Sequence, residues 1–234
     1  MSIQKIPEKN SVFFEWFNQY SGILLKTPTK TFAIDPVDVK HKHLKNIDII
    51  LLTHEHYDHL DTRLVKDVQK NTNCTIIADP ASAFQLKPHI PIDKLQVIRI
   101  GEVIKVGEVS IKAAKCNHEA RYPNTYIITS EDGVKIYHTA DSLPFPELAK
   151  MGLDEKFDLV FCSVGIAKNA SPESGFEIAR LTKPPLVVPY HSNSQANQKA
   201  FQQLIKKELP RTACLIPEIN KIYQISKQVK TQNK

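Results

Sequence analysis

The 234-residue sequence lacks any run of eighteen or more apolar residues, and residues 1–7 lack the apolar segment of a secretory signal peptide. We therefore expect no membrane insertion and a cytoplasmic location. Cysteine is also scarce. The four thiols are far apart, form no C-x-x-C pair and are expected to stay reduced, without disulfide bonds; they are Cys74, Cys116, Cys162 and Cys214.

The usual features of nucleic-acid-binding proteins are absent as well. There is no Gly-rich phosphate loop, no basic stripe interleaved with aromatic residues and no RNA-binding signature. The net charge is +6, from 31 basic and 25 acidic residues, with lysines concentrated towards the C-terminus at Lys221, Lys227, Lys230 and Lys234. We interpret this charge as a solvated surface with a frayed basic tail from about residue 227, although a positive field would also steer an anionic substrate.

The most informative segment that is present is THEHYDHLD at residues 53–61, between an apolar run and a helix-like polar stretch. Neutral imidazoles and carboxylates are the usual ligands of catalytic Zn²⁺ and its first-row neighbours, and a loop that leaves a buried strand lets them converge. Residues two apart on an extended chain point the same way, so His54 and His56 can hold one ion while Asp58 and His59 face a second. The spacing favours two metal ions over one. The alternative is a solvated polar loop, against which the expected strand–loop–helix context argues, and the pattern differs from the helical His-Glu-x-x-His zinc site.

Two ions need more ligands than one loop supplies, and three further candidates lie where strands are expected to end. His118 follows an alternating run of apolar residues. Asp141 follows the second strand of a hairpin that turns at Asp132-Gly133. His191 ends a short apolar run and precedes a helix-start signal at residues 192–194.

The order of these residues resembles the signature of the metallo-β-lactamase fold superfamily of metal-dependent hydrolases: His-x-His-x-Asp-His, then a distant His, an Asp and a last His. The similarity runs from about Phe13 to Tyr223. It implies an α/β fold, a four-layer αββα sandwich, with residues 1–234 forming a single domain. Within the superfamily, the chain looks like the branch of ascorbate-phosphate lactonases and N-acylphosphatidylethanolamine phospholipase D.

The resemblance also implies a role for each matched residue. One ion would be held by three imidazoles, those of His54, His56 and His118. The other would be held by Asp58, His59 and His191, with Asp141 bridging both ions. Asp58 and Asp141 are thereby the expected catalytic carboxylates. Imidazole mixed with carboxylate oxygen, and no cysteine, favours two Zn²⁺ ions, with Mn²⁺ or Fe as alternatives.

The chain departs from the family pattern in places that concern the substrate pocket more than the metals. Ala140-Asp141-Ser142 replaces the usual Gly-Asp-Thr, and residues 163–167 lack the second glycine of a Gly-Gly turn. Asp35 either accepts the spare N–H of a ligand imidazole or only forms an Asp-Pro turn. His138 and Tyr190 either donate to a leaving group or pack in the core.

The rest of the chain is typical of one mixed α/β domain, with 41% hydrophobic residues. Short alternating runs between residues 12 and 34 predict an antiparallel meander. Strands then alternate with helices that open near a Ser, Asp or Pro, and we expect these helices at residues 61–70, 147–151, 173–181 and 195–207.

Two divalent ions would lower the pKa of a bridging water to about 7, so that a hydroxide is available at neutral pH. We therefore predict a hydrolase that cleaves a small ester, lactone or phosphodiester, with an anionic substrate compatible with the net charge. A nuclease acting on RNA or DNA is the alternative, but the chain lacks the arm of tRNA-processing nucleases and room for a β-CASP domain. A non-catalytic metal-binding protein is the third hypothesis, against which the intact bridging carboxylate argues. The sequence does not predict an oligomeric state.

Overall fold

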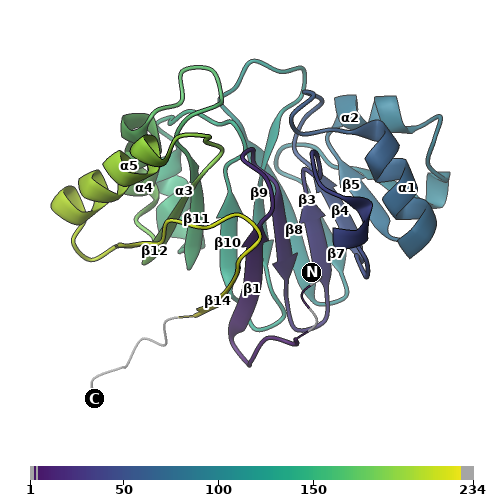
Figure 1. Cartoon of the computed structure of the whole chain (residues 1–234), viewed down its shortest axis with the longest axis horizontal. Coiled ribbons are helices and arrows are strands. Elements are labelled where there is room, and N and C mark those ends of the chain that lie inside the picture. Colours follow the sequence, from purple (N-terminus) through teal and green to yellow (C-terminus); the bar gives the residue numbers. More distant parts are fainter. Residues whose placement is uncertain (1–2, 4, 228–234) are drawn as a thin grey trace.

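A computed structural model describes residue 3 and residues 5–227, so the predicted basic tail beyond Lys227 lies outside the described residues. Two seven-stranded sheets form its centre (Figure 1). The first sheet has the order β14 (Ile222–Ser226), β1 (Ser11–Trp16), β2 (Ile23–Lys26), β3 (Thr31–Ile34), β4 (Ile49–Leu52), β5 (Thr75–Ala78) and β6 (Leu95–Val97). The second has the order β13 (Ala213–Cys214), β12 (Leu186–Tyr190), β11 (Leu159–Ser163), β10 (Lys135–His138), β9 (Asn124–Thr129), β8 (Val109–Lys115) and β7 (Val103–Val106).

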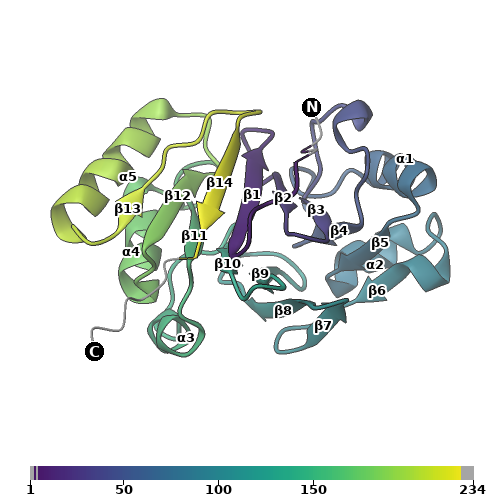
Figure 2. The same ribbon diagram turned by 90° about the horizontal axis from the view of Figure 1, so that it is seen from below.

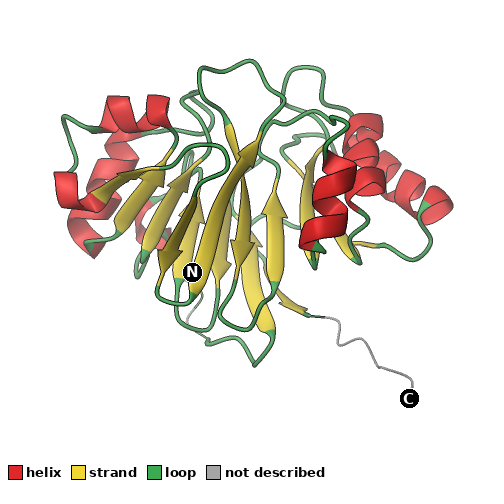
Figure 3. Cartoon of the chain, turned by 180° about the vertical axis from the view of Figure 1, so that it is seen from behind, coloured by secondary structure: helices red, strands yellow, loops and turns green. Residues whose placement is uncertain are grey.

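Helices cover the outer faces of both sheets. Figures 1 and 2 show two helices on one side of the molecule, α1 (Thr62–Thr72) and α2 (Pro80–Leu86). On the opposite side lie α3 (Leu148–Glu155), α4 (Pro172–Thr182) and α5 (Gln195–Glu208). With the strands between two flanks of helix (Figure 3), the predicted four-layer αββα sandwich is confirmed.

Three apolar layers hold the sandwich together. The largest lies between the sheets and includes Phe14, Leu51 and Phe161, while α1 and α2 pack on the first sheet and α3 to α5 on the second. In β4 successive side chains alternate between two of these layers: Leu51 faces the other sheet and Leu52 faces the helices. Because both faces are buried, this strand is one continuous apolar run, and each such side chain contributes roughly 1.5–3 kcal/mol by its burial.

Most predicted elements are present with shifted ends. The meander pairs as expected, since β1 and β2, and β2 and β3, are antiparallel. The helix expected at 147–151 continues to Glu155 and ends where Lys156 takes a left-handed conformation, with φ +54°. The sequence interpretation missed α2, although its start carries a local signal: Asp79 accepts hydrogen bonds from Ala81 and Ser82, and Pro80 is the first helical residue.

No helix in the part of the chain from residue 5 to residue 227 combines the length and hydropathy needed to cross a membrane.

The strand topology brings several loops together at one edge of the sandwich. The parallel strands β3 and β4, and β10, β11 and β12, end at that edge. The loops that follow them therefore meet above the interface between the two sheets (Figure 1).

Candidate metal centre

The loop with the densest group of histidines connects β4 to α1, as the sequence predicted. Within it a tight turn brings the backbone N–H of His59 to 3.0 Å from the carbonyl oxygen of His56. The carboxylate of Asp61 then accepts a hydrogen bond from the backbone N–H of Leu64 at 2.9 Å and begins α1. Because of this turn, the side chains of His54 and His56 point to one group of ligands and those of Asp58 and His59 to another.

The remaining candidate ligands reach the same place from the second sheet. His118, Asp141 and His191 follow β8, β10 and β12. Ala140 and His191 have φ angles of +47° and +50°, a left-handed conformation that residues other than glycine seldom adopt. Strained backbone of this kind persists where surrounding contacts hold it, and it is concentrated at functional sites.

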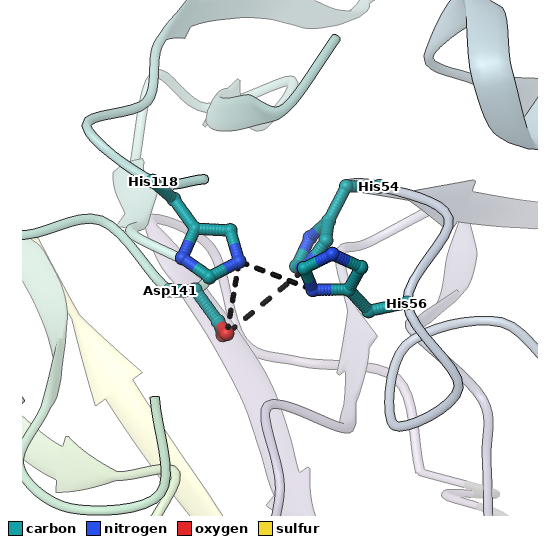
Figure 4. A group of neighbouring side chains, drawn as sticks. All are labelled: His54, His56, His118 and Asp141. Atoms are coloured by element: carbon teal, nitrogen blue, oxygen red, sulfur yellow. Dashed lines mark hydrogen bonds and ion pairs between the residues drawn. The ribbon is translucent and has the colours of Figure 1, made fainter. Parts of the chain in front are cut away.

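Four side chains form the first group, with ligand atoms that all lie within 4.8 Å of one another: His54, His56, His118 and Asp141 (Figure 4). Nδ1 of His56 lies 3.2 Å from Nε2 of His54 and 3.2 Å from Nε2 of His118. Oδ2 of Asp141 lies 3.6 Å from Nε2 of His118 and 3.9 Å from Nε2 of His54. Three imidazoles and one carboxylate oxygen thus surround one point.

The second group shares the carboxylate of Asp141 with the first and adds Asp58, His59 and His191. Oδ1 of Asp141 lies 2.9 Å from Nε2 of His59 and 3.1 Å from Nδ1 of His191. Oδ2 of Asp58 lies 3.5 Å from Nε2 of His191 and 3.9 Å from Nε2 of His59. The structure therefore brings together all seven side chains singled out in the sequence and divides them as the resemblance implied.

Both groups have the donor spacing that a metal ion requires. With Zn–N bonds of about 2.0–2.1 Å, adjacent ligands of a tetrahedral ion are roughly 3.3–3.4 Å apart, close to the 3.2 Å between the imidazole nitrogens of the first group. In the second group, Nε2 of His59, Oδ1 of Asp141 and Nε2 of His191 are buried, and none forms a hydrogen bond of good geometry within the described chain, although the first two atoms are only 2.9 Å apart. Buried polar atoms without partners are costly, and a cation between them would remove that cost.

The electrostatics of the second group also favour a cation. Burial works against a charged His59, but the carboxylates of Asp141 and Asp35 outweigh it and raise the pKa of that imidazole well above its usual value. Burial likewise works against an ionised Asp141, yet His59 and His191 hold the pKa of its carboxyl well below its usual range. The carboxylates therefore attract positive charge to this point, which a divalent ion would supply more fully than protons.

Asp35 orients one of the candidate ligands, so it is more than a turn residue. Its Oδ2 lies 2.8 Å from Nδ1 of His59, and it accepts hydrogen bonds from the hydroxyls of Ser21 at 2.8 Å and Thr53 at 2.7 Å. Its Oδ1 accepts the backbone N–H of Thr53 at 2.9 Å. A carboxylate at Nδ1 fixes the imidazole with Nε2 free to face the centre, the usual arrangement behind a metal-bound histidine.

The contacts of His138 and Tyr190 favour the hypothesis that they pack in the core over the hypothesis that they donate to a leaving group. Both side chains are fully buried between the sheets. Nε2 of His138 donates to the carbonyl oxygen of Ser21 at 2.9 Å, and the hydroxyl of Tyr190 donates to the carbonyl oxygen of Ala140 at 3.3 Å. His138 thereby fastens the β1–β2 turn of the first sheet to the second sheet, directly behind Asp35.

The sequence interpretation predicted strands on both sides of the β1–β2 turn but gave the turn itself no role at the site. Asn18, which is buried, holds this turn: its Oδ1 accepts the backbone N–H groups of Tyr20 and Gly22, each at 3.0 Å, and its Nδ2 donates to the carbonyl oxygen of Val37 at 2.8 Å. The turn presents the hydroxyl of Ser21 to Nδ1 of His59 at 2.9 Å. No local sequence signal marks Ser21, because its role depends on contacts with residues far along the chain.

Metal content is the direct test of the two groups. We expect the purified protein, after dialysis against metal-free buffer, to retain close to two equivalents of transition metal, and the Asp58→Asn variant to retain about one, because Asp58 belongs only to the second group. Elemental analysis by mass spectrometry measures both. Asp67→Asn, the same change on the exposed face of α1, should keep two equivalents. Protein that binds no metal even after reconstitution with Zn²⁺, Mn²⁺ or Fe²⁺ would contradict the assignment.

Comparisons with known proteins agree with this geometry. Residues 21–212 match the model of a family described as Beta-lactamase superfamily domain. A UPF0173 metal-dependent hydrolase from Thermoplasma acidophilum is 28% identical over 198 residues, which cover 80% of this chain and 84% of the relative. Igni18 from Ignicoccus hospitalis, a metallo hydrolase, has a similar structure, with a TM-score of 0.79, 19% identity, and 93% and 100% of the two chains covered. The metallo-beta-lactamase fold protein YhfI from Bacillus subtilis matches with a TM-score of 0.71, 15% identity, and 92% and 100% coverage.

Proposed function

We propose a function from the premise that this chain belongs to the Beta-lactamase superfamily domain family, whose model matches residues 21–212. Relatives that align over most of their length are named metal-dependent hydrolases, and this chain is one as well. We infer further that it cleaves a small ester, lactone or phosphodiester. The observation that carries this proposal is the convergence of seven metal-ligating side chains into two groups that share Asp141.

Seven side chains would hold two metal ions, and several others orient the ligands. His54, His56 and His118 would hold one ion and Asp58, His59 and His191 the other, with Asp141 between them. Two such ions, when bound, would supply an activated water at neutral pH and a Lewis acid for the electrophile. Asp35, Ser21 and Thr53 keep His59 oriented, while the hydroxyl of Ser163 lies 3.2 Å from Nδ1 of His191 and steadies that ring.

The surroundings of the centre support a small substrate more than a polynucleotide. A pocket of about 480 Å³ lies beside the second group, since the ring of Tyr20 in its lining meets the ring of His191, and its size suits a small molecule. Among its lining residues are the carboxylates Asp38 and Asp61, and no lysine or arginine. A phosphate backbone laid across this pocket would meet negative charge, and the positive contacts that nucleic-acid binding requires are missing there.

The salt dependence of turnover separates the two functions. A polynucleotide is held through many phosphate contacts, so kcat/KM for a short RNA should fall steeply between 50 and 200 mM salt, by about 10³-fold or more. A small ester or diester in a pocket should change severalfold at most, since few charges are involved. We expect the small substrate to be cleaved more efficiently and with the shallow dependence. The inactive Asp141→Asn variant controls for contaminating ribonuclease. Metal-dependent RNA cleavage that is much the faster activity and falls steeply with salt would replace the proposal with a nuclease.

A further inference from the structure

Two tyrosines and two carboxylates line the pocket beside the second group of metal-ligating side chains. We call it the tyrosine pocket and define it by Tyr20, Tyr57, Asp38, Asp61 and the buried Leu60 at its base. Tyr57 immediately precedes Asp58 in the chain, and the ring of Tyr20 meets the ring of His191 edge-on, with centroids 6.2 Å apart. Tyr20 thus places the pocket beside the second group, although none of the seven metal-ligating side chains lines it, and a substrate long enough to span both would have its reacting bond at the centre.

Tyr20 and Tyr57, the two aromatic residues that line the pocket, differ in how many contacts fix them. Tyr20 belongs to the β1–β2 turn that Asn18 holds, and its carbonyl oxygen also accepts the indole N–H of Trp16 at 2.7 Å. The backbone that carries the ring of Tyr20 is thus fixed before any ligand binds. Tyr57 lies on the loop after β4 with 82% of its surface exposed, far more than a large aromatic side chain retains when it contributes to a core. Tyr57 therefore packs little against the described residues, and a ligand in the pocket would cover more of it.

The charge of the pocket is negative although that of the protein is +6. No ion pair is found for Asp38 or Asp61 among residues 5–227, and the pocket lining includes no basic side chain. Asp61 caps α1 with one carboxylate oxygen, and Asp38 occupies a turn with φ +48°, which aspartate tolerates. These local roles account for the backbone at both positions but leave two negative charges facing the same pocket.

We propose that the tyrosine pocket binds a cationic ammonium group on the part of the substrate that is not hydrolysed. The proposal rests on the proposed hydrolase function and names the substrate class of that same site. An ammonium group that contacts the two phenol rings lining the pocket would gain cation–π attraction, and the two lining carboxylates would add Coulomb attraction. A carboxylate or phosphate at the same place would be repelled. This reverses the expectation of an anionic substrate, which came from net charge summed over the whole surface.

Binding without chemistry provides the first test. Choline and 3,3-dimethylbutan-1-ol have nearly the same shape and differ in charge, so their dissociation constants can be compared by calorimetric titration of the metal-loaded protein. We expect choline to bind about tenfold more tightly, a difference that cation–π and exposed ion-pair contributions together allow. The variant Asp38→Asn/Asp61→Asn should lose the ion-pair contribution, so that its preference for choline falls to about threefold, the part that cation–π attraction alone supplies. Asparagine caps helices as well as aspartate, so α1 should remain intact in this variant.

A control variant removes two negative charges far from the tyrosine pocket. Asp93 and Glu108 are exposed and precede β6 and β8, at the edge of the sheets opposite the centre. Asp93→Asn/Glu108→Gln should keep the tenfold preference. Loss of the preference in this variant would mean that only overall charge matters, and it would overturn the proposal, as would equal binding of the two compounds to the unaltered protein.

Hydrolysis of a matched pair of esters provides the second test. The 4-nitrophenyl esters of 4-(trimethylammonio)butanoate and 5,5-dimethylhexanoate differ in one atom, and both release 4-nitrophenolate. We expect about tenfold higher kcat/KM for the cationic ester. If both are cleaved equally and choline does not bind selectively, the pocket inference is wrong and the hydrolase function stands. If choline binds selectively but no ester, lactone or diester is cleaved, the pocket inference survives and the proposed function fails.

Discussion

Asp141→Asn should lower kcat/KM for any substrate that the protein hydrolyses by about 10³-fold or more, a loss of roughly 4 kcal/mol of transition-state stabilisation. Asp141 is the one side chain that belongs to both groups, and asparagine keeps its size while removing the charge that the groups share. The amide would also place N–H donors against the histidines. Metal content should fall together with activity.

The fold should survive this change, because Asp141 lies beyond the end of β10 and outside the apolar layers. Circular dichroism and thermal unfolding check this point. Asp158→Asn is the matched control: its carboxylate accepts the backbone N–H of Lys135 at 2.8 Å, at the opposite end of the same strand. Near-normal turnover in Asp141→Asn, or an equal loss in Asp158→Asn, would refute a centre bridged by Asp141.

Asp35→Ala should destabilise the protein by about 3–5 kcal/mol and weaken metal binding about 10- to 100-fold. Asp35 is completely buried, and its removal leaves the hydroxyls of Ser21 and Thr53 and a backbone N–H without their acceptor. The ring of His59 also loses the carboxylate that fixes its orientation. Urea unfolding of the metal-free protein measures the first effect, and competition with a chelator measures the second.

Asp48→Ala provides the comparison for Asp35. Asp48 is exposed, and its carboxylate accepts the backbone N–H of Thr31 at 2.7 Å. This contact lies where β3 and β4 begin, whereas Asp35 lies where they end. Its loss should cost about 1 kcal/mol and leave metal affinity unchanged. If the affinity of the Asp35 variant also stays unchanged while its stability falls, Asp35 supports the fold alone and does not orient His59.

Much of the centre could be predicted from the sequence because its pattern is local. His54, His56, Asp58 and His59 lie within one short loop between an apolar run and a capped helix, and such a loop can hardly keep its ligands apart. The more distant ligands share a simpler property, since each follows a strand and parallel strands end at a common edge. This topology brings the seven side chains to one edge, while their division into two groups was implied by the family resemblance.

The surroundings of the centre were much harder to predict. β10 and β12 are buried on both faces, so hydrophobic alternation does not reveal that His138 and Tyr190 face the other sheet. The β1–β2 turn carries no metal-ligating residue type, and its shape depends on the tertiary hydrogen bond between Asn18 and Val37. The orientation of these side chains and the shape of this turn therefore depend on contacts between residues distant in the sequence, which local patterns do not reveal.

The β1–β2 turn contributes both to the metal centre and to the tyrosine pocket, so the two cannot change independently there. Ser21 supports His59, a candidate metal ligand, and the adjacent Tyr20 forms a wall of the tyrosine pocket. An insertion or exchange here that reshaped the pocket would displace Ser21 too, so most such variants would lose metal before they gained a new substrate. Change of specificity within this lineage should therefore accumulate on the opposite wall, around Asp38 and Tyr57, where side chains are exposed and can vary without disturbing the centre.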